Sequence, residues 1–276
     1  MQLLIEPIVR AALLEDMGRA GDITTDAIVA EGAMTSGALR ARKAGRLCGV
    51  EVAATAFRLA DPAVKFETRL ADGADLEPNA TIATIRGSAR GILTAERTAL
   101  NFLCHLSGIA TATNRFVRLI EGSKAKIIDT RKTTPGLRTL EKYAVRVGGG
   151  MNHRFGLDDA VLIKDNHIAF AGGIKPAIEA VRRSVGHLVK AEVEVDDLAQ
   201  LRECLDLKVE VILLDNFSLE RMREAVKMTA GRAILEASGR VTEENVHAIA
   251  ETGVDLISSG WITHSAPALD IGLDFD

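Results

Sequence analysis

The second half of the chain repeats one pattern: a short apolar run, a polar end or turn, and then a stretch with helical spacing. The apolar runs predict strands at 126–130, 160–166, 188–195, 209–216, 232–239 and 254–260. Apolar residues three or four positions apart predict helices between them, at 138–147, 174–185, 197–206, 218–229 and 242–252. Six strand-helix units in a row favour an α/β barrel with a parallel sheet, and an open doubly wound sheet is the alternative.

The first half of the chain is mixed and predicts an α+β unit. Helical spacing predicts helices at 4–17, 52–60 and 91–108, with a second helix at 109–121 after Ser107-Gly108. Alternation predicts strands within 35–50 and at 64–70, and Asp-Gly and Glu-Pro-Asn turns predict a hairpin within 71–89. Between the first helix and these strands we expect a loop at 22–29, with Thr24 and Thr25 as capping candidates.

These elements predict an α/β protein with two domains. An N-terminal α+β sandwich domain is expected at 1–108, and the barrel domain at 109–264. The last segment, 265–276, is too short for another strand-helix unit, so we expect it to pack back on the first domain.

Composition narrows the functional class. The chain has 276 residues and a formal net charge of −4, with 47% hydrophobic and 26% charged residues, which is ordinary for a soluble enzyme. The acidic balance and an aromatic content of 4% argue against a nucleic-acid binder, which needs basic patches and stacking platforms.

The cysteines and the N-terminus indicate a cytoplasmic protein. Cys48, Cys104 and Cys204 are far apart and lack metal-ligand spacing, so we expect reduced, apolar side chains. The first residues carry acids and lack the cationic start of a signal peptide. No run approaches the roughly 18 apolar residues of a membrane span.

The stretch from Asp129 to His167 is locally basic. It contains seven Lys or Arg and five acids, a balance of 7 − 5 = +2 within an acidic chain. Cations at the ends of rigid strands suit a ligand with several negative charges, whereas an ordinary solvated basic face is the competing interpretation.

Barrel enzymes carry their reacting groups at the carboxyl ends of the strands. The candidates at these ends are Arg131, Lys132, Lys164, Asp165, Asn166, Glu192 or Glu194, Asp215, Asn216, Glu236, Ser238, Gly239, Ser258, Ser259 and Gly260. The Ala-Ser-Gly and Ser-Ser-Gly turns end the last two strands, where barrels often bind phosphate, although a plain loop is the alternative.

Two acids at strand ends are candidates for a sugar phosphate. Glu192 and Glu194 share one side of their strand, and Glu194 lies nearer its carboxyl end, so we choose Glu194. Glu194 and Asp215 are candidates for sugar hydroxyls or for a Mg²⁺ that a diphosphate ligand brings, with a structural salt bridge to a lysine as the alternative. The sequence has no Cys/His cluster and no H-E-x-x-H helix, so we expect no dedicated metal site.

Several long segments resemble the quinolinate phosphoribosyltransferase family of NAD biosynthesis, within the type II phosphoribosyltransferases. They are AERTALNFLCHLSGIAT, DTRKTTPGLRTLEKYAV, GGGMNHRFGLDDAVLIKDNHI, EVEV, ILLDN, EASG and THSAPALDIGLDF, which together span nearly the whole chain. The resemblance implies an N-terminal sandwich, an incomplete α/β barrel, and a homodimer or larger assembly in which the partner subunit completes each active site.

The resemblance also implies the reaction. Quinolinate and phosphoribosyl pyrophosphate (PRPP) would give nicotinate mononucleotide, pyrophosphate and CO₂, with Mg²⁺ and no organic cofactor. It implies Lys132, Lys164, Glu194 and Asp215 as catalytic residues. The residues implied for substrate binding are Arg131, His153, Arg154 and Lys164 for the two carboxylates, Arg97 from the neighbouring subunit, Lys132, Glu194 and Asp215 for PRPP, and Ser238, Gly239, Gly260 and His264 at its phosphate end. Thr130 and Ser259 are further substrate-binding candidates.

One position departs from the family pattern, and four alternative functions remain. Trp261 follows a glycine where the family more often has a small residue, so we expect different packing there. The nearest alternative is a phosphoribosyltransferase for nicotinate or a related acid, which needs fewer cations than a diacid. The others are a molybdenum-operon homologue, a barrel lyase with Lys164 as Schiff-base amine, and a non-catalytic phosphosugar-binding protein.

Overall fold

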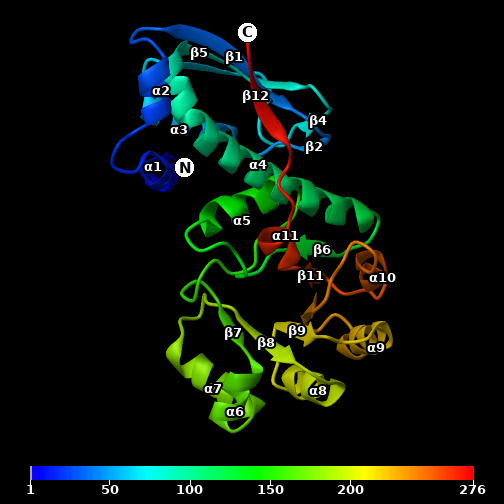
Figure 1. Ribbon diagram of the computed structural model, residues 1–276. Coiled ribbons are helices and arrows are strands. Elements are labelled where there is room, and N and C mark those ends of the chain that lie inside the picture. Colours follow the sequence, from blue (N-terminus) through cyan, green and yellow to red (C-terminus); the bar gives the residue numbers. More distant parts are fainter. Residues whose placement is uncertain (1) are drawn as a thin grey trace. The chain divides into compact units, whose positions relative to one another are not determined.

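The computed structural model describes residues 2–276, which form two compact units (Figure 1). The first unit comprises the chain up to Asn114, Thr134–Gly149 and Ala266–Asp276. The second comprises Arg115–Thr133 and Gly150–Ser265.

The first unit contains a four-stranded antiparallel sheet in the order β12-β1-β5-β3. Its strands are β1 (Met34–Ala41), β3 (Lys65–Thr68), β5 (Thr81–Ser88) and β12 (Ile271–Phe275). A separate pair joins β2 (Gly45–Arg46) to β4 (Asp75–Leu76). The predicted hairpin within 71–89 is therefore wrong, because β5 pairs with β1 and β3 instead of β4. The last residues of the chain add β12 to the edge of this sheet beside β1.

The helices of the first unit are α1 (Gln2–Met17), α2 (Ile23–Ile28), α3 (Val50–Ala60), α4 (Ala89–Leu119) and α5 (Arg138–Val147). In α1, Ile5, Val9 and Leu13 recur every four residues and form the buried side. The loop expected at 22–29 is instead α2, because the Asp22 carboxylate accepts a hydrogen bond from the Thr25 N–H and caps the helix.

α4 is one continuous helix, so the predicted break at Ser107-Gly108 is wrong. The Ser107 hydroxyl contacts both the N–H and the C=O of Cys48, at 3.0 and 3.1 Å. A Cβ on Gly108 would lie 2.3 Å from the Pro267 carbonyl oxygen. The glycine therefore permits a close backbone approach inside the helix and does not end it.

The observed units differ from the predicted domain boundaries at two places. We expected 109–264 to form a single barrel domain, but α4 continues to Asn114 within the first unit, and α5 packs there as well. The Asn114 side chain donates to the Gly148 carbonyl at 3.2 Å, and His105 Nε2 lies 2.8 Å from Glu141 Oε1. These contacts connect the two helices.

The second unit contains a six-stranded parallel sheet in the order β6-β11-β10-β9-β8-β7. Its strands are β6 (Lys126–Ile128), β7 (Val161–Ile163), β8 (Ala191–Val195), β9 (Val211–Asp215), β10 (Ile234–Ser238) and β11 (Leu256–Ser258). Within residues 2–276 the first and last strands of this order, β6 and β7, are not paired with each other. The sheet is therefore an incomplete α/β barrel, as the sequence predicted.

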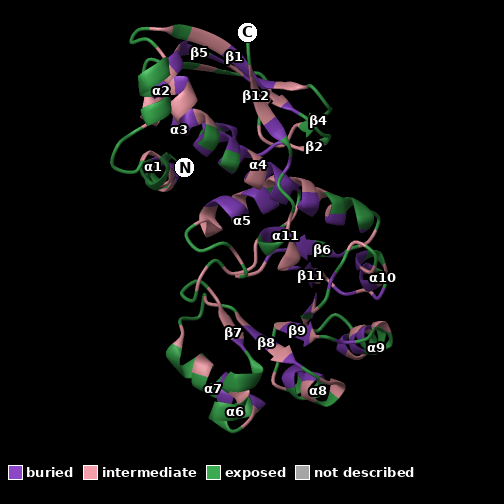
Figure 2. Cartoon of the chain, in the orientation of Figure 1, coloured by how far each residue is buried: buried purple, intermediate pink, exposed green. Residues whose placement is uncertain are grey.

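Helices follow most of these strands and cover the outside of the sheet (Figure 1). They are α7 (Ile174–Ser184), α8 (Leu198–Asp206), α9 (Leu219–Thr229) and α10 (Val246–Ala250). Two short helices that the sequence pattern missed, α6 (Asp165–Ala171) and α11 (Trp261–His264), follow β7 and β11 directly. Figure 2 shows buried residues along the strands and exposed residues on the outward helix faces.

The cysteines are largely buried, as expected for apolar side chains. Cys48 and Cys204 are buried, Cys104 is partly buried, and burial raises the pKa of the Cys204 thiol to about 12. Among residues 2–276, no helix combines the length and the apolar composition needed to cross a bilayer.

Candidate active site

A cavity of about 870 Å³ lies at the carboxyl ends of the parallel strands of the second unit. Its lining includes every predicted substrate-binding residue except Arg97. These residues are Thr130, Arg131, Lys132, His153, Arg154, Lys164, Glu194, Asp215, Ser238, Gly239, Ser259, Gly260 and His264. The cavity therefore has the position expected for a barrel active site and a strongly polar wall.

Lys132 is fixed by its backbone just after β6. Its N–H donates to the Thr130 hydroxyl at 3.0 Å, and its C=O accepts from the Thr263 hydroxyl at 2.7 Å. A Cβ on Gly260 would lie 2.8 Å from Lys132 Cδ, so this glycine leaves room for the lysine stem. The exposed ammonium is thus carried into the cavity on an anchored residue.

Two arginines place positive charge in the same wall. The Nε atom of Arg131 is buried and has no hydrogen-bond partner among the described residues. Arg154 donates from Nη1 to the Ala160 carbonyl at 3.3 Å. Burial, and then the nearby charge of Arg131, lowers the pKa of Arg154. A pair of cations this close, one with an unused donor, favours an anionic ligand.

A buried aspartate holds the segment that carries His153. Asp129 follows β6 and is fully buried. Its Oδ1 accepts from the His153 N–H at 2.8 Å, and its Oδ2 accepts from the Asn152 side chain at 2.7 Å. Met151 also forms a parallel bridge with Ile128. The segment after α5 is thereby tied to the end of β6 and places His153 in the cavity wall.

The two glutamates of β8 act at two levels of the sheet. Near the carboxyl end of the strand, Glu194 accepts from Lys164 Nζ at 2.8 Å, and both residues line the cavity. Two residues earlier on the same side, Glu192 lies 2.8 Å from His153 Nε2 and is buried beneath the cavity lining. Alternation places both side chains on one face of the strand. Of the two, Glu194 lines the cavity, which agrees with its choice as the site candidate.

The ends of β9 and β10 approach each other closely. The Asn216 N–H donates to the Ser238 carbonyl at 2.9 Å, and its side chain donates to Asp215 Oδ2 at 2.8 Å. Gly239 has φ +105°, and a Cβ there would lie 2.2 Å from Asn216 Oδ1. Glycine is required at this turn both by its backbone conformation and by the available space.

Trp261 has a packing partner beneath the cavity. Its ring stacks on Phe116, with ring centroids 5.8 Å apart and an interplanar angle of 24°. Both residues belong to the second unit, and Trp261 lines the cavity. Trp261 therefore contributes an aromatic wall near Gly260 and His264.

Five lining residues were not singled out from the sequence: Leu162, Leu213, Arg240, Val241 and Thr242. Asn216, Glu236 and Ser258 were candidates at strand ends and line the cavity, whereas the candidates Asp165, Asn166 and Glu192 are not part of its lining. Arg240 and Thr242 lie within three residues of the Ala-Ser-Gly turn, which the sequence predicted as a phosphate-binding turn. The two leucines gave no signal, since they continue apolar strands.

The basic stretch from Asp129 to His167 divides between the two units. Arg131, Lys132, Arg154 and Lys164 line the cavity, whereas Arg138, Lys142 and Arg146 belong to α5 in the first unit. Arg97 is also in the first unit, exposed on α4, and does not line the cavity.

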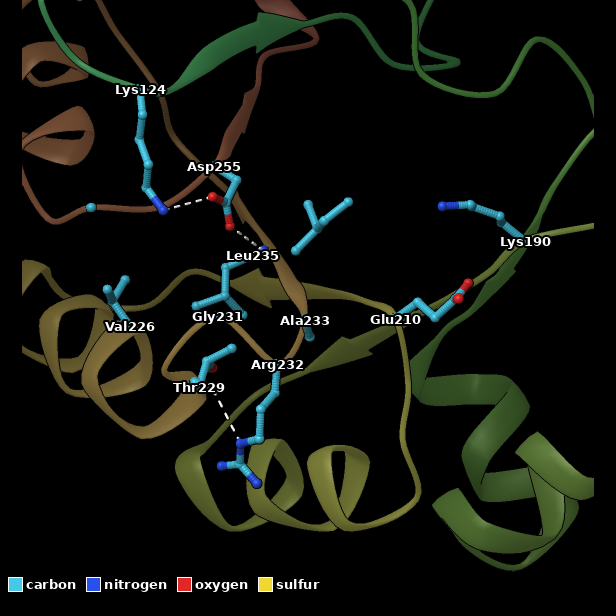
Figure 3. Close-up of a pocket in the computed structure, with 12 residues that line it drawn as sticks. Lys124, Lys190, Glu210, Val226, Thr229, Gly231, Arg232, Ala233, Leu235 and Asp255 are labelled. Atoms are coloured by element: carbon cyan, nitrogen blue, oxygen red, sulfur yellow. Dashed lines mark hydrogen bonds and ion pairs between the residues drawn. The ribbon is translucent and has the colours of Figure 1, made fainter.

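A second cavity, of about 410 Å³, lies at the opposite ends of the strands (Figure 3). There Lys124 Nζ pairs with Asp255 Oδ1 at 2.6 Å, and Asp255 Oδ2 accepts from the Leu235 N–H. Arg232 donates to the Thr229 carbonyl at 3.1 Å. These contacts tie neighbouring chain segments together, which is the stabilising role expected at this face of a barrel.

Known proteins resemble the chain over nearly its whole length. Residues 22–107 and 109–274 match the N-terminal and C-terminal domains of quinolinate phosphoribosyl transferase. The carboxylating nicotinate-nucleotide pyrophosphorylase of Mycobacterium leprae is 48% identical over 271 residues, covering 96% of this chain and 95% of that protein. The nicotinate-nucleotide pyrophosphorylase structure from Francisella tularensis has a TM-score of 0.95 at 42% identity, covering 100% and 97% of the two chains. The chain belongs to the quinolinate phosphoribosyltransferase family.

Proposed function

We propose that this protein transfers the phosphoribosyl group of PRPP to quinolinate and releases pyrophosphate and CO₂, forming nicotinate mononucleotide. The observation that carries the proposal is the cluster of three cations in the cavity wall. Arg131 Nε has no hydrogen-bond partner among residues 2–276, Arg154 lies beside it, and Lys164 approaches from the end of β7. Two arginine forks and an ammonium match the two carboxylates of a pyridine diacid.

The opposite side of the cavity suits PRPP. Ser238 ends β10 and Gly239 follows it, Ser259 and Gly260 follow β11, and the Lys132 stem lies next to Gly260. Glycine turns let backbone N–H groups approach phosphate oxygens, and lysine supplies a mobile positive charge. Glu194 and Asp215 line the space between the two sides and are suited to the hydroxyls of the ribose.

The residues present account for catalysis without a protein nucleophile. As the bond from ribose C1 to pyrophosphate breaks, positive charge develops on the sugar and negative charge on the leaving group. Lys132 stabilises the leaving pyrophosphate, and the carboxylates of Glu194 and Asp215 stabilise the sugar cation. The ring nitrogen then bonds to C1 and becomes cationic. The adjacent C–CO₂ bond breaks, its electron pair stays on the ring carbon, and that carbon takes up one proton.

Mg²⁺ is part of the proposal. Asp215 fits this cation, because its carboxylate lines the cavity and a carboxylate oxygen is a preferred Mg²⁺ ligand. The Glu194 carboxylate is paired with the Lys164 ammonium, so we assign Glu194 to the sugar alone, and Asp215 to both the sugar and the cation. The cation neutralises phosphate charge when it arrives with PRPP. The chemistry requires no organic cofactor, since the ribosylated ring itself accepts the electron pair.

We also propose a homodimer or larger assembly in the cytoplasm. Support for shared sites comes from Arg97, a cation on α4 that the family resemblance places in the partner's site and that is exposed here. The buried thiols of Cys48 and Cys204 support a reducing compartment.

The test is an assay of pyrophosphate and CO₂ with PRPP, Mg²⁺ and either quinolinate or nicotinate. We expect release of both products with quinolinate and neither with nicotinate, because a single carboxylate leaves part of the cationic wall unmatched. Turnover of nicotinate without CO₂ would mean that the cationic wall does not serve to bind a diacid. Lack of turnover with both acids would overturn the proposal.

A further inference from the structure

A cluster at the cavity wall joins His153 to two buried glutamates that have no role in the proposed chemistry. Glu192 comes from β8, Glu236 from β10 and His153 from the segment after α5. His153 Nε2 lies 2.8 Å from Glu192 Oε2 and 3.6 Å from Glu236 Oε2. Glu192 and Glu236 are 7% and 1% exposed. Two carboxyl groups are thus held together with little access to water.

The backbone decides which nitrogen of His153 carries the proton. The Arg154 N–H donates to His153 Nδ1 at 2.7 Å, so Nδ1 must present a lone pair. The ring proton is therefore on Nε2, where it is donated to Glu192. One ligand atom from each residue lies within 4.8 Å of the others, as in a metal site. A metal ion, however, would need the Nε2 lone pair, which this tautomer does not offer.

The two carboxyl groups lack enough donors if both are ionised. Glu192 Oε1 and Glu236 Oε2 are buried and have no hydrogen-bond partner among the described residues. Burial raises the pKa of Glu236 well above its usual value, and the charge of Glu192 raises it further. Asp129 at the end of β6 adds to this effect, whereas the Ser258 hydroxyl of β11 opposes it. The remaining groups near the pair are His153, which donates to Glu192, and Arg154.

We propose that Glu192 and Glu236 share one proton, with Glu236 as the neutral acid and Glu192 as the carboxylate that accepts from His153. In this arrangement Glu236 is a positioning residue. It supplies the missing donor to Glu192, which in turn fixes the ring of His153 and the adjacent Arg154 in the cavity wall. The functional part of this inference rests on the proposed quinolinate site.

The arrangement also limits negative charge below the substrate. A second ionised carboxylate would lie beneath a wall that has to attract a diacid. Loss of the shared proton therefore weakens quinolinate binding more than PRPP binding, because Arg154 belongs to the quinolinate side. An unpaired Glu192 displaces His153 with a similar result.

Three variants test the shared proton and its function: Glu236→Gln, Glu236→Leu and, as control, Glu224→Gln at an exposed acid of α9. Unfolding midpoints are measured from about pH 5 to about pH 8, above the ordinary glutamate pKa of about 4.3. A raised pKa in the folded state makes the wild type lose stability as pH rises through this range. Glu236→Gln should not show this loss, so its midpoint rises relative to the wild type, whereas Glu224→Gln follows the wild type.

The kinetic arm separates positioning from a purely structural role. Glu236→Leu removes the donor to Glu192, so the KM for quinolinate should rise about fivefold or more, while the KM for PRPP changes less than about twofold. Glu236→Gln keeps a donor and should restore most of the quinolinate KM.

Three outcomes overturn the inference. A midpoint difference between wild type and Glu236→Gln that is constant with pH excludes the shared proton, as does stoichiometric metal in the purified protein. Equal effects of Gln and Leu on both KM values exclude positioning of the quinolinate side. Because unfolding is measured without substrate, absence of quinolinate turnover in the wild type would contradict the proposed function and leave the test of the proton intact.

Discussion

Lys164 Nζ lies 2.8 Å from Glu194 Oε2, and this pair connects the ends of β7 and β8 at the cavity. The lysine side chain is 46% exposed and the glutamate 13% exposed, so the ammonium faces both its partner and the cavity. An ion-paired ammonium is protonated and is not the free amine that a Schiff-base lyase requires. The geometry therefore favours a lysine that binds anions.

Replacing Lys164 by Ala should weaken quinolinate binding and slow turnover. Loss of one charged hydrogen bond to a carboxylate, with Glu194 left unpaired, should raise the quinolinate KM about 10- to 100-fold. Steady-state kinetics of Lys164→Ala and of Lys175→Ala, an exposed lysine of α7, test this expectation. Wild-type kinetics in Lys164→Ala would remove the residue from the site.

Arg97 should act in the active site of a neighbouring subunit. Arg97→Ala and Lys164→Ala variants should each be nearly inactive, and mixing them with subunit exchange should restore part of the activity, because some sites then have both cations. Activity before and after mixing is the measurement, with exchange verified by a size or mass label. Unrestored activity despite exchange would place Arg97 in its own subunit or outside the site.

Gly239→Ala should weaken PRPP binding. The substitution forces a side chain into a left-handed backbone at a cost of about 1–2 kcal/mol. It also displaces Asn216, whose Oδ1 would lie 2.2 Å from the new Cβ. We expect the KM for PRPP to rise about tenfold or more, beyond the backbone cost alone.

The matched control is Gly231→Ala, which has φ +77° but no atom within 4 Å of its added Cβ. It should lower stability and leave the PRPP KM near that of the wild type. Similar PRPP kinetics in the two variants would contradict the role of the Gly239 turn.

Removal of Mg²⁺ should abolish turnover, and Asp215→Asn should raise the Mg²⁺ concentration needed for half-maximal rate. The reason is that an amide oxygen binds this cation less strongly than a carboxylate does. The check is a Mg²⁺ titration of both proteins after treatment with a chelator, with Asp206→Asn at the end of α8 as control. An unchanged Mg²⁺ requirement in Asp215→Asn would mean that Asp215 does not bind the cation.

Asp22→Ala should destabilise the first unit at neutral pH and matter less in acid. Hydrogen bonds from Thr25 lower the pKa of Asp22, so its stabilising contribution is present above the unfolded-state value and lost as pH falls through the folded one. Loss of such a helix cap costs about 1 kcal/mol. Unfolding midpoints at about pH 7 and about pH 3 should therefore differ more between wild type and variant at the higher pH.

Periodicity predicted the second unit well because each of its strands and helices is short, strongly patterned and bounded by polar turns. Periodicity failed where contacts between segments far apart in the sequence determine the local structure. Gly108 looked like a helix break, but its lack of a side chain serves a contact with Pro267. The segment at 71–89 looked like a hairpin, but β4 pairs with β2 instead.

The gathering of the candidate residues around one cavity was largely predictable, because the strand ends of a barrel converge and their charges are visible in the sequence. What the sequence could not show is how far each side chain lies from the cavity surface. Glu192 and Glu194 have the same side and the same chemistry, and only their distances to His153 and Lys164 separate a buried proton-sharing role from a cavity role. Arg97 lies in the first unit and does not line the cavity, so its role in a partner's site stays a prediction.

The most direct measurement uses quinolinate labelled with ¹³C in the carboxyl group next to the ring nitrogen, together with PRPP and Mg²⁺. The account predicts that the label leaves as CO₂, in equal amount to the pyrophosphate, while the nucleotide product carries none. Label retained in the nucleotide, or pyrophosphate released without labelled CO₂, would contradict the proposed reaction.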